Sequence, residues 1–348
     1  MPLSICFLIE GPILSPAYFR ALGLSNALVQ LGHEIIIVCD NRKDNLEKID
    51  EIKKSGINVV SYEAHPKIKS ILECRKILGL NKSSWLVQLN PTLRGFFTLF
   101  GHNHKVIGEW DEPIIFVPQN LIKKCINYLL HYWFISKSKI HVSCTKAFLK
   151  YLPNGIYIPH GQHISQDCMK SIAVDSEEYY AYLGNFYPLF DHDLLFYSLK
   201  DAATRNFLPK VVMIGGGPDL QKWKDYAIKH ELKNIEFKGY CTVEEFMPIL
   251  KGARALLFPM RNTKLNCCRC SSKIFAYLAS GVPVVAHSIG EIKELLNEVA
   301  YLANFDDDLI ELLEKKVYKD IKISKLNDHI SYDHLAKKYI EIIYNAKF

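Results

Sequence analysis

The 348-residue sequence lacks a hydrophobic run long enough to cross a membrane, and it lacks internal repeats and low-complexity segments. Its longest charge-free apolar stretch of interest, Cys125–Ser136, is far shorter than the ~20 residues that a membrane-spanning helix needs. The opening MPLSICFLIE has no basic region before its apolar run, so we expect a first strand rather than a signal peptide. These absences exclude fibrous, coiled-coil and membrane-spanning classes. They favour a soluble cytoplasmic protein or one peripheral on the inner face of the membrane.

Acidic residues are absent between Pro113 and Gln166, a stretch that holds six lysines. Residues 1–165 carry 19 Lys/Arg against 12 Asp/Glu, so the first half of the chain is basic and should favour an anionic partner. Within it, Leu121–Lys139 mixes lysines with Leu, Ile, Tyr, Trp and Phe. This composition is typical either of a helix on an anionic membrane surface or of a buried helix with lysines at its ends. No basic motif or base-stacking module indicates nucleic acid.

The sequence also lacks a full set of metal ligands. Cys267 and Cys270 form a single C-x-x-C, and structural zinc needs four ligands, so free thiols are expected. Asp191-His192-Asp193 has the spacing of a metal-binding D-x-D, but it stands at an expected helix start, where N-capping is the favoured interpretation. We therefore expect no metal site.

Short apolar strands alternate with amphipathic helices, which is typical of parallel sheets covered on both faces. Expected strands in the first half are Leu3–Ile9, Glu34–Asp40, Asn58–Tyr62, Ser84–Leu89, Lys105–Trp110 and Ile114–Val117. Those in the second half are Tyr179–Gly184, Lys210–Gly215, Asn234–Gly239, Ala253–Phe258 and Pro283–His287. The polar stretch His163–Glu178 separates the two series. The sequence thus predicts an α/β protein with two Rossmann-like domains, 1–165 and 166–330, facing a ligand cleft, and a terminal helix over 331–348.

The segment 256–296 has the strongest local pattern: a strand, a polar loop, a helix, Gly-x-Pro, a buried strand and a second helix. Ser271 and Ser272 precede the amphipathic KIFAYLAS, where unbonded N–H groups and the helix dipole suit a phosphate. Four cations accompany them: Arg261, Lys264, Arg269 and Lys273. The alternative is a solvated basic loop.

This segment resembles the donor-binding region of GT-B glycosyltransferases, specifically the retaining family-4 group, also called glycosyl transferases group 1. The pattern N-x-x-R-x-x-x-K-L-x-E-Y-L-A-x-G-x-P-V-V-A is matched in order by Asn266, Arg269, Lys273, Tyr277, Leu278, Ala279, Gly281, Pro283, Val284, Val285 and Ala286. Elsewhere, MIGGGPDLQKWKDYA resembles the family's IGxGP turn, and IPHGQ stands where the family has I-P-N-G. SYDHLAKKYIEIIY resembles the terminal helix that crosses back to the first domain.

The resemblance implies a hexosyltransferase-type enzyme with an acceptor domain first and a donor domain second. It would move a sugar from a UDP- or GDP-type nucleotide-diphosphate sugar to a hydroxyl of a glycan or glycolipid precursor of a surface polysaccharide, with retention and without cofactor or metal. The expected diphosphate-binding residues are Arg261, Arg269, Ser271, Ser272 and Lys273. The rest of the donor cleft would include Gly184, Asn185, Gly215, Gly216, Gly217, Tyr240 and Asn266.

On the acceptor side we expect Arg20 and His160. Asp111 and Glu112, which follow a strand in GEWDEP, are the candidate bases if the reaction inverts; their alternative is a solvated loop. The glycine triplet also fits a simple tight turn, and Tyr240 a packed surface aromatic.

Three departures from the family pattern leave other functions open. The positions of the family's two donor-site glutamates are occupied by Cys268 and Ala276. The lysine that the family has after the G-N turn at the start of the donor domain is missing. In the first loop, SPAYFR replaces the family's glycine pair. The alternatives are a non-catalytic GT-B protein that partners an active transferase, and a sugar-nucleotide epimerase or hydrolase of the same fold.

Overall fold

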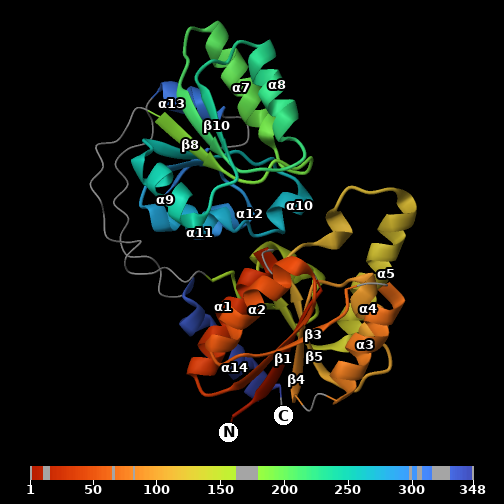
Figure 1. Ribbon diagram of the computed structural model, residues 1–348. Coiled ribbons are helices and arrows are strands. Elements are labelled where there is room, and N and C mark those ends of the chain that lie inside the picture. The colour runs from red at the N-terminus through yellow and green to blue at the C-terminus, as the bar shows by residue number, and fades with distance from the viewer. Residues whose placement is uncertain are drawn as a thin grey trace. The chain divides into compact units, whose positions relative to one another are not determined.

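The computed structural model describes residues 2–10, 16–64, 67–80, 83–161, 179–297, 300–303, 308–315 and 330–346. The chain folds into two compact units (Figure 1). The first contains Met1–His163, Cys268–Cys270 and Asn327–Phe348, and the second contains Ile164–Cys267 and Ser271–Leu326. The expected domain boundary at residues 165 and 166 lies outside the described residues.

The first unit is built on a seven-stranded parallel sheet with the order β3-β2-β1-β4-β5-β6-β7. Its strands are β1 (Ser4–Ile9), β2 (Glu34–Asp40), β3 (Asn58–Tyr62), β4 (Trp85–Leu89), β5 (Lys105–Trp110), β6 (Ser138–Ser143) and β7 (Ile156–Tyr157). Its helices are α1 (Pro16–Gln30), α2 (Lys43–Lys54), α3 (Lys67–Leu80), α4 (Leu93–Leu99), α5 (Leu121–Lys137) and α14 (Tyr332–Asn345), with the short 3-10 helices η1 (Ile114–Phe116) and η2 (Lys146–Tyr151).

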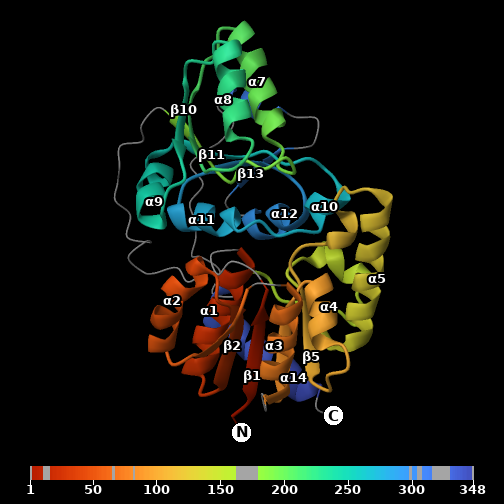
Figure 2. The same ribbon diagram turned by 45° about the vertical axis from the view of Figure 1, so that its right-hand side comes forward.

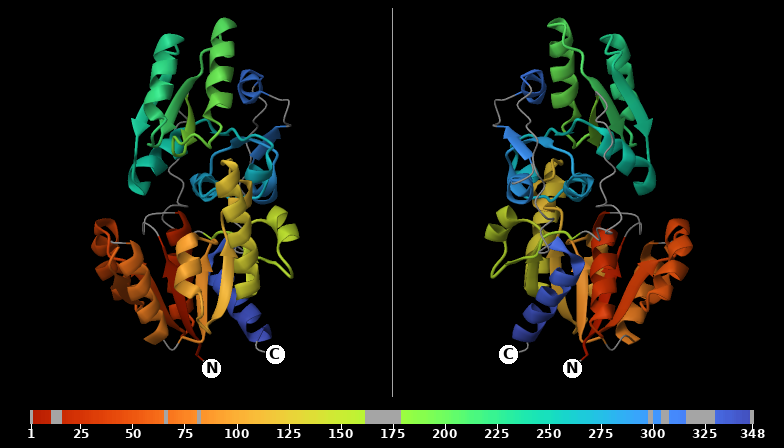
Figure 3. Two further views of the ribbon diagram at one scale, coloured as in Figure 1. Left: turned by 90° about the vertical axis from the view of Figure 1, so that its right-hand side faces the viewer. Right: turned by 90° about the vertical axis from the view of Figure 1, so that its left-hand side faces the viewer.

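The central strands of this sheet are apolar on both faces because helices cover both of them (Figure 3). Ile5, Phe7 and Ile37 pack into the core on one face, and Cys6 and Leu8 into the core on the other. Parallel pairing of β1 with β2 and β4 then aligns the carboxyl ends of these strands at one edge.

The C-terminal helix α14 packs on α1 in the first unit, although it follows the whole second unit in the sequence (Figure 1). Ser331 caps it by accepting a hydrogen bond from the His334 N–H. The ring of Tyr332 fills the space above Gly23, where an added Cβ would lie 2.2 Å from the ring. A glycine at position 23 therefore permits the close approach of α1 and α14.

The second unit has a six-stranded parallel sheet with the order β10-β9-β8-β11-β12-β13. Its strands are β8 (Tyr179–Leu183), β9 (Lys210–Ile214), β10 (Ile235–Gly239), β11 (Ala255–Phe258), β12 (Val284–His287) and β13 (Ala300–Ala303). Its helices are α7 (His192–Thr204), α8 (Leu220–Lys229), α9 (Val243–Gly252), α10 (Lys264–Cys267), α11 (Lys273–Ser280), α12 (Gly290–Leu296) and α13 (Leu309–Glu314). Figure 2 shows α7 and α8 side by side.

One expected strand is wrong: Ile114–Val117 forms the 3-10 helix η1 instead. Prolines at positions 113 and 118 flank it, and each lacks the N–H that a strand would donate to its neighbour. The strands β6, β7 and β13 were not expected. β6 follows α5 without a loop, so the pattern of the helix hides where the strand begins.

Candidate functional site

The candidate donor site lies at the carboxyl edge of the sheet in the second unit. The chain runs from β8 outward through β9 and β10 on one side, and returns through β11, β12 and β13 on the other. The connections therefore diverge between β8 and β11. In open α/β sheets, ligands bind outside the carboxyl ends of the strands at such a switch point.

The glycine triplet follows β9 at this edge, and two of its members are packed against the loop after β8. Gly215 and Gly217 have φ angles of 138° and 145°. A Cβ on Gly215 would lie 1.9 Å from the Gly184 carbonyl oxygen, and one on Gly217 would lie 2.4 Å from the Phe186 carbonyl oxygen. These glycines therefore serve the close approach of two loops of the same unit. Only Gly216 has its nearest such neighbour, the Tyr240 Cβ, at an ordinary contact distance of 3.8 Å.

Lys273 is the first residue of α11, and its ammonium lies over the switch point. The side chain is buried, with Nζ 4.5 Å from the ring centroid of Tyr182 on β8 and 4.8 Å from that of Phe258 on β11. A Cβ on Gly184 would lie 2.8 Å from Nζ, so glycine leaves room for the ammonium there. Ring faces attract a cation but do not neutralise its charge.

A buried polar chain continues from Lys273 into the unit. Lys273 Nζ donates to Tyr182 Oη at 3.1 Å, and Tyr182 Oη lies 3.2 Å from His192 Nε2. The His192 ring stacks on Phe186 with 4.5 Å between centroids. Burial, together with the nearby Lys273 charge, lowers the pKa of His192 to about 4. The imidazole is thus neutral near pH 7, and its Nε2 can accept a hydrogen bond from the Tyr182 hydroxyl.

Arg261, also expected to bind phosphate, is held by two carboxylates. Its guanidinium donates to Asp193 at 2.7 and 2.8 Å and to Asp191 at 3.2 Å, and its backbone N–H donates to Asp191 at 2.9 Å. The hydrogen bond from Arg261 is the main cause of the lowered pKa of Asp193. Asp191 stands at the N-cap of α7, as expected for this D-x-D, but its side chain makes no capping hydrogen bond and accepts hydrogen bonds from Arg261 instead.

The other expected donor residues have different environments. Asn266 is buried and donates from Nδ2 to Asp191 at 2.8 Å and to the Arg261 carbonyl oxygen at 2.9 Å, which braces the loop after β11. Ser272, the N-cap of α11, makes no side-chain capping hydrogen bond and is exposed, whereas the body of the helix is buried. Asn185 is exposed, and Tyr240 is 77% exposed after β10.

In the first unit, Arg20 is a buried structural cation. It is 1% exposed and forms a two-pronged contact with Glu109, 3.2 Å from each carboxylate oxygen. It also donates to the carbonyl oxygens of Ile158 and Pro159 at 3.1 and 2.5 Å. The guanidinium therefore joins α1, the end of β5 and the segment that follows β7.

Asp111, expected as a candidate base, and His160, expected on the acceptor side, form one cluster with Cys144. The His160 Nε2 hydrogen bonds to Asp111 Oδ1, and the Cys144 thiol lies 3.4 Å from the same oxygen. Burial alone would raise the pKa of Asp111, but the His160 ring and the Arg20 charge outweigh it, and the pKa is lowered. Among the described residues, these three side chains form a group whose possible metal-ligating atoms all lie within 4.8 Å of one another.

Asn90 fixes the backbone of this cluster. It has a φ of 57°, and its Oδ1 accepts the N–H groups of Asp111 and Glu112 at 2.8 and 2.9 Å. Glu112 itself is exposed, and its pKa is raised by desolvation and by the Asp111 carboxylate. Asp111 is thus held at two points: Asn90 accepts a hydrogen bond from its backbone N–H, and His160 hydrogen bonds to its carboxylate.

Arg269 is buried and lies in Cys268–Cys270, the short segment that belongs to the first unit, whereas Arg261 and Lys273 belong to the second. Cys268 and Ala276, at the positions of the family's glutamates, are also buried. Sequence reasoning missed Tyr182, His192, Asn90 and Cys144 as members of these clusters. For Asn90, the Asn-Pro that follows an expected strand was an available signal.

Comparison with known proteins identifies the class. The sequence model of the family described as Glycosyl transferases group 1 matches residues 177–317, which cover the described site of the second unit. No curated protein sequence matches the chain. The resemblance to solved structures extends over nearly the whole chain. The sequence identities are only 11–12%, so this resemblance shows the fold alone.

Three solved structures illustrate this fold. A variant of S. aureus TarM in complex with fondaparinux, alpha-GlcNAc-glycerol and UDP has a TM-score of 0.74 at 11% identity, covering 99% of each chain. Anabaena Alr3699/HepE in complex with UDP-glucose has a TM-score of 0.67 at 11% identity, covering 99% of this chain and 98% of that one. A putative UDP-N-acetylglucosamine 2-epimerase from Listeria monocytogenes has a TM-score of 0.59 at 12% identity, covering 100% and 97%.

The two parallel sheets and the family match thus define a glycosyltransferase of the GT-B fold. The matching family is glycosyl transferases group 1, and the match falls on the second unit.

Proposed function

We propose that the protein transfers a hexose from a UDP- or GDP-type sugar to a hydroxyl of a glycan or lipid-linked precursor of a surface polysaccharide. Transfer would retain the anomeric configuration and need no metal. The second unit would hold the donor and the first unit the acceptor. The observation that carries the proposal is the Lys273 ammonium over the β8–β11 switch point, supported by Tyr182 and surrounded by ring faces.

In this proposal, Lys273 stabilises the charge that develops on the departing diphosphate. A positioned cation in a water-poor setting can supply leaving-group stabilisation without a metal. The departing phosphate then assists the acceptor hydroxyl, and no protein nucleophile is required. The tip of α11, where Ser271 is half-buried and Ser272 is exposed, would offer N–H groups to the same phosphates. Gly216, Asn185 and Tyr240 would meet the nucleoside.

On the acceptor side, we propose that Asp111 orients the acceptor hydroxyl. Asn90 fixes its backbone and His160 its carboxylate, whereas Glu112 has an exposed side chain. The lowered pKa keeps Asp111 ionised at neutral pH, so it can accept a hydrogen bond from a hydroxyl.

The first test is nucleotide binding. A thermal-shift screen with UDP-, GDP-, CMP- and dTDP-sugars should give a concentration-dependent rise in melting temperature for one base, because a ligand of the folded state stabilises it. Lys273→Met should weaken that binding by roughly 10- to 100-fold, because this change in affinity corresponds to the free energy of one charge-assisted hydrogen bond. The matched control is Lys222→Met, since Lys222 on α8 also lies over a ring, 4.6 Å from the Trp223 centroid. Equal loss in both variants would contradict the diphosphate assignment.

The second test separates the transferase from its alternatives. Release of free nucleotide should require an acceptor for a transferase. Turnover of the donor without acceptor would instead indicate an epimerase or hydrolase, for which the Listeria structure offers a fold precedent. Nucleotide binding without turnover of any donor would indicate the non-catalytic partner that Cys268 and Ala276 leave open.

A further inference from the structure

The N-terminal half of α5 has an exposed apolar surface that the transferase chemistry does not use. Asn120 caps the helix through a hydrogen bond from the Lys123 N–H, so the helix is well defined from its first turn. Its exposed large apolar side chains form what we call the α5 patch. The patch consists of Leu121, Ile122, Ile126, Tyr128, Leu129 and Tyr132, which are 36–76% exposed.

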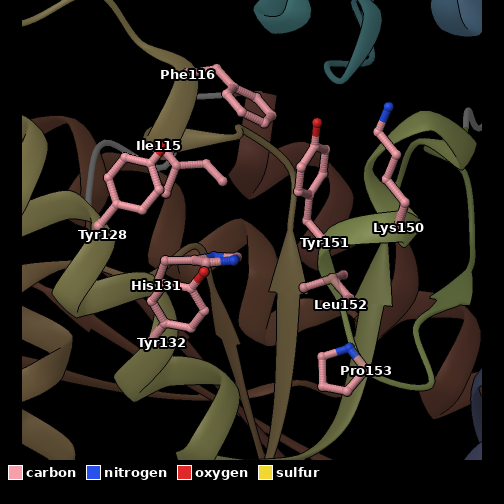
Figure 4. Close-up of a pocket in the computed structure, with 9 residues that line it drawn as sticks. All are labelled: Ile115, Phe116, Tyr128, His131, Tyr132, Lys150, Tyr151, Leu152 and Pro153. Carbon is pink, nitrogen blue, oxygen red and sulfur yellow. The ribbon is translucent and has the colours of Figure 1, made fainter.

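The patch continues onto neighbouring elements of the first unit. Phe97 and Phe100 at the end of α4 are 49% and 60% exposed, and Phe96 of α4 packs edge-on against Trp133 of α5 at 4.8 Å. On its other side, a cavity of about 430 Å³ opens beside Tyr128 and Tyr132 (Figure 4). Phe116 and Tyr151 line it opposite α5, so its walls are mainly aromatic. Single exposed apolar residues are ordinary, but a contiguous patch indicates an interaction site.

The charged residues of the helices that form the patch and its cavity are all basic. The helices α4, α5 and η2 together contain six Lys/Arg and no Asp/Glu. Lys123 and Lys124 are exposed within the patch itself, and Lys150 lines the cavity. A second copy of this chain would bring a patch of the same positive sign, which opposes self-association. The surface complements an anionic one.

We propose that the α5 patch docks the first unit on an anionic lipid bilayer. The apolar side chains would enter the boundary between headgroups and acyl chains, and the lysines would contact lipid phosphates. Tyrosine and tryptophan favour this interfacial depth because each has an apolar body and a polar tip. Among the described residues, no helix is long and apolar enough to span a bilayer. The α5 helix, with 17 residues, would therefore lie on the membrane rather than cross it.

The proposal stands apart from the sugar-transfer chemistry, so vesicle binding without any donor tests it. Flotation with phosphatidylcholine vesicles that contain phosphatidylglycerol should recover the protein at ~0.05 M salt and release it at ~0.5 M, where charges are screened within a few Å. Pure phosphatidylcholine should bind it weakly. Lys123→Gln with Lys124→Gln should weaken binding by about five-fold per lysine. Equal binding to both lipids, or none at low salt, would overturn the proposal.

The apolar contribution has a matched control. Ile122→Ser should weaken vesicle binding by about ten-fold, because a largely exposed aliphatic side chain would no longer enter the bilayer. Ile228→Ser, at a similarly exposed position in the second unit, should leave binding unchanged. If Ile122→Ser instead changes the sedimentation of the protein from an oligomer to a monomer, the patch is a protein interface and the membrane proposal is wrong.

Tryptophan fluorescence gives a test in the unaltered protein. Trp133 lies on α5 and is half-buried, whereas Trp85, Trp110 and Trp223 are at most 3% exposed. Vesicles with brominated acyl chains should therefore quench Trp133 selectively, and Trp133→Phe should abolish the quenching. Binding without quenching would mean that another surface meets the lipid, which would refute the assignment to α5.

Discussion

Replacement of Arg20 by methionine should destabilise the first unit strongly. Methionine retains much of the apolar length of the side chain but removes the guanidinium that contacts Glu109 and the carbonyl oxygens of Ile158 and Pro159. Glu109 is 1% exposed and would remain as a buried charge without its cation. Removing one partner of a buried ion pair costs about 3–5 kcal/mol, and this pair is buried on both sides.

The loss is a large fraction of the ~5–15 kcal/mol that separates folded from unfolded domains. Urea unfolding should be followed by fluorescence in a Trp223→Phe background, because the three remaining tryptophans all lie in the first unit. Lys48→Met, on α2 of the same unit, is the control. Lys48 and Glu51 are 2.8 Å apart but well exposed, and an exposed pair contributes at most ~1 kcal/mol.

A double variant separates two contributions to the loss of stability: the lost attraction between Arg20 and Glu109, and the cost of leaving the Glu109 charge buried without its cation. Glu109→Gln in the Arg20→Met background removes the buried charge, so the double variant should regain about 2 kcal/mol relative to Arg20→Met alone. A loss below ~1 kcal/mol for Arg20→Met, or no recovery in the double variant, would refute the reasoning.

Two further predictions concern Glu10 and Tyr182. Burial raises the pKa of Glu10 from 4.5 to about 6, so the folded state loses stability as pH rises through this range. Glu10→Gln should therefore raise the free energy of unfolding by about 2 kcal/mol at pH 8 and change it little near pH 4, measured by urea titration at both values. Tyr182→Phe keeps the ring beside Lys273 but removes the hydroxyl between Nζ and His192, and should weaken nucleotide binding about five-fold by calorimetry. Tyr179→Phe, whose hydroxyl donates to the Ile249 carbonyl oxygen, should not change it.

The strands that the sequence predicted well are those with strong local patterns. Glu34–Asp40, Asn58–Tyr62 and Lys105–Trp110 form strands with the expected bounds, because β-branched or apolar runs between turns favour buried parallel strands. Ile114–Val117 has a similar apolar run but does not form a strand, because the prolines on either side have no backbone N–H to donate to a neighbouring strand. Local pattern therefore predicts a strand only where the backbone can also pair.

The environments of the site residues depend on partners far away in the sequence. Arg20 and Glu109 are 89 positions apart, and Arg261 and Asp193 are 68 apart. No spacing rule connects such pairs, because they meet only when parallel strands align their carboxyl ends. Sequence reasoning could thus select a cationic segment as the candidate site, but it could not distinguish an arginine held by carboxylates from a cation that is open to a ligand.

That distinction decides which cation of the second unit is suited to a diphosphate. Arg261 and Lys273 come from the same basic segment, but Arg261 shares its charge with Asp191 and Asp193, so an approaching phosphate would meet a carboxylate pair as well as a guanidinium. Lys273 has ring faces and a hydroxyl around it, which orient the ammonium in a buried setting. An ammonium in such a setting of low polarity attracts a phosphate more strongly than a cation exposed to water does. The proposed donor site therefore depends on Lys273, and Arg261 serves to hold the loop after β11 in place.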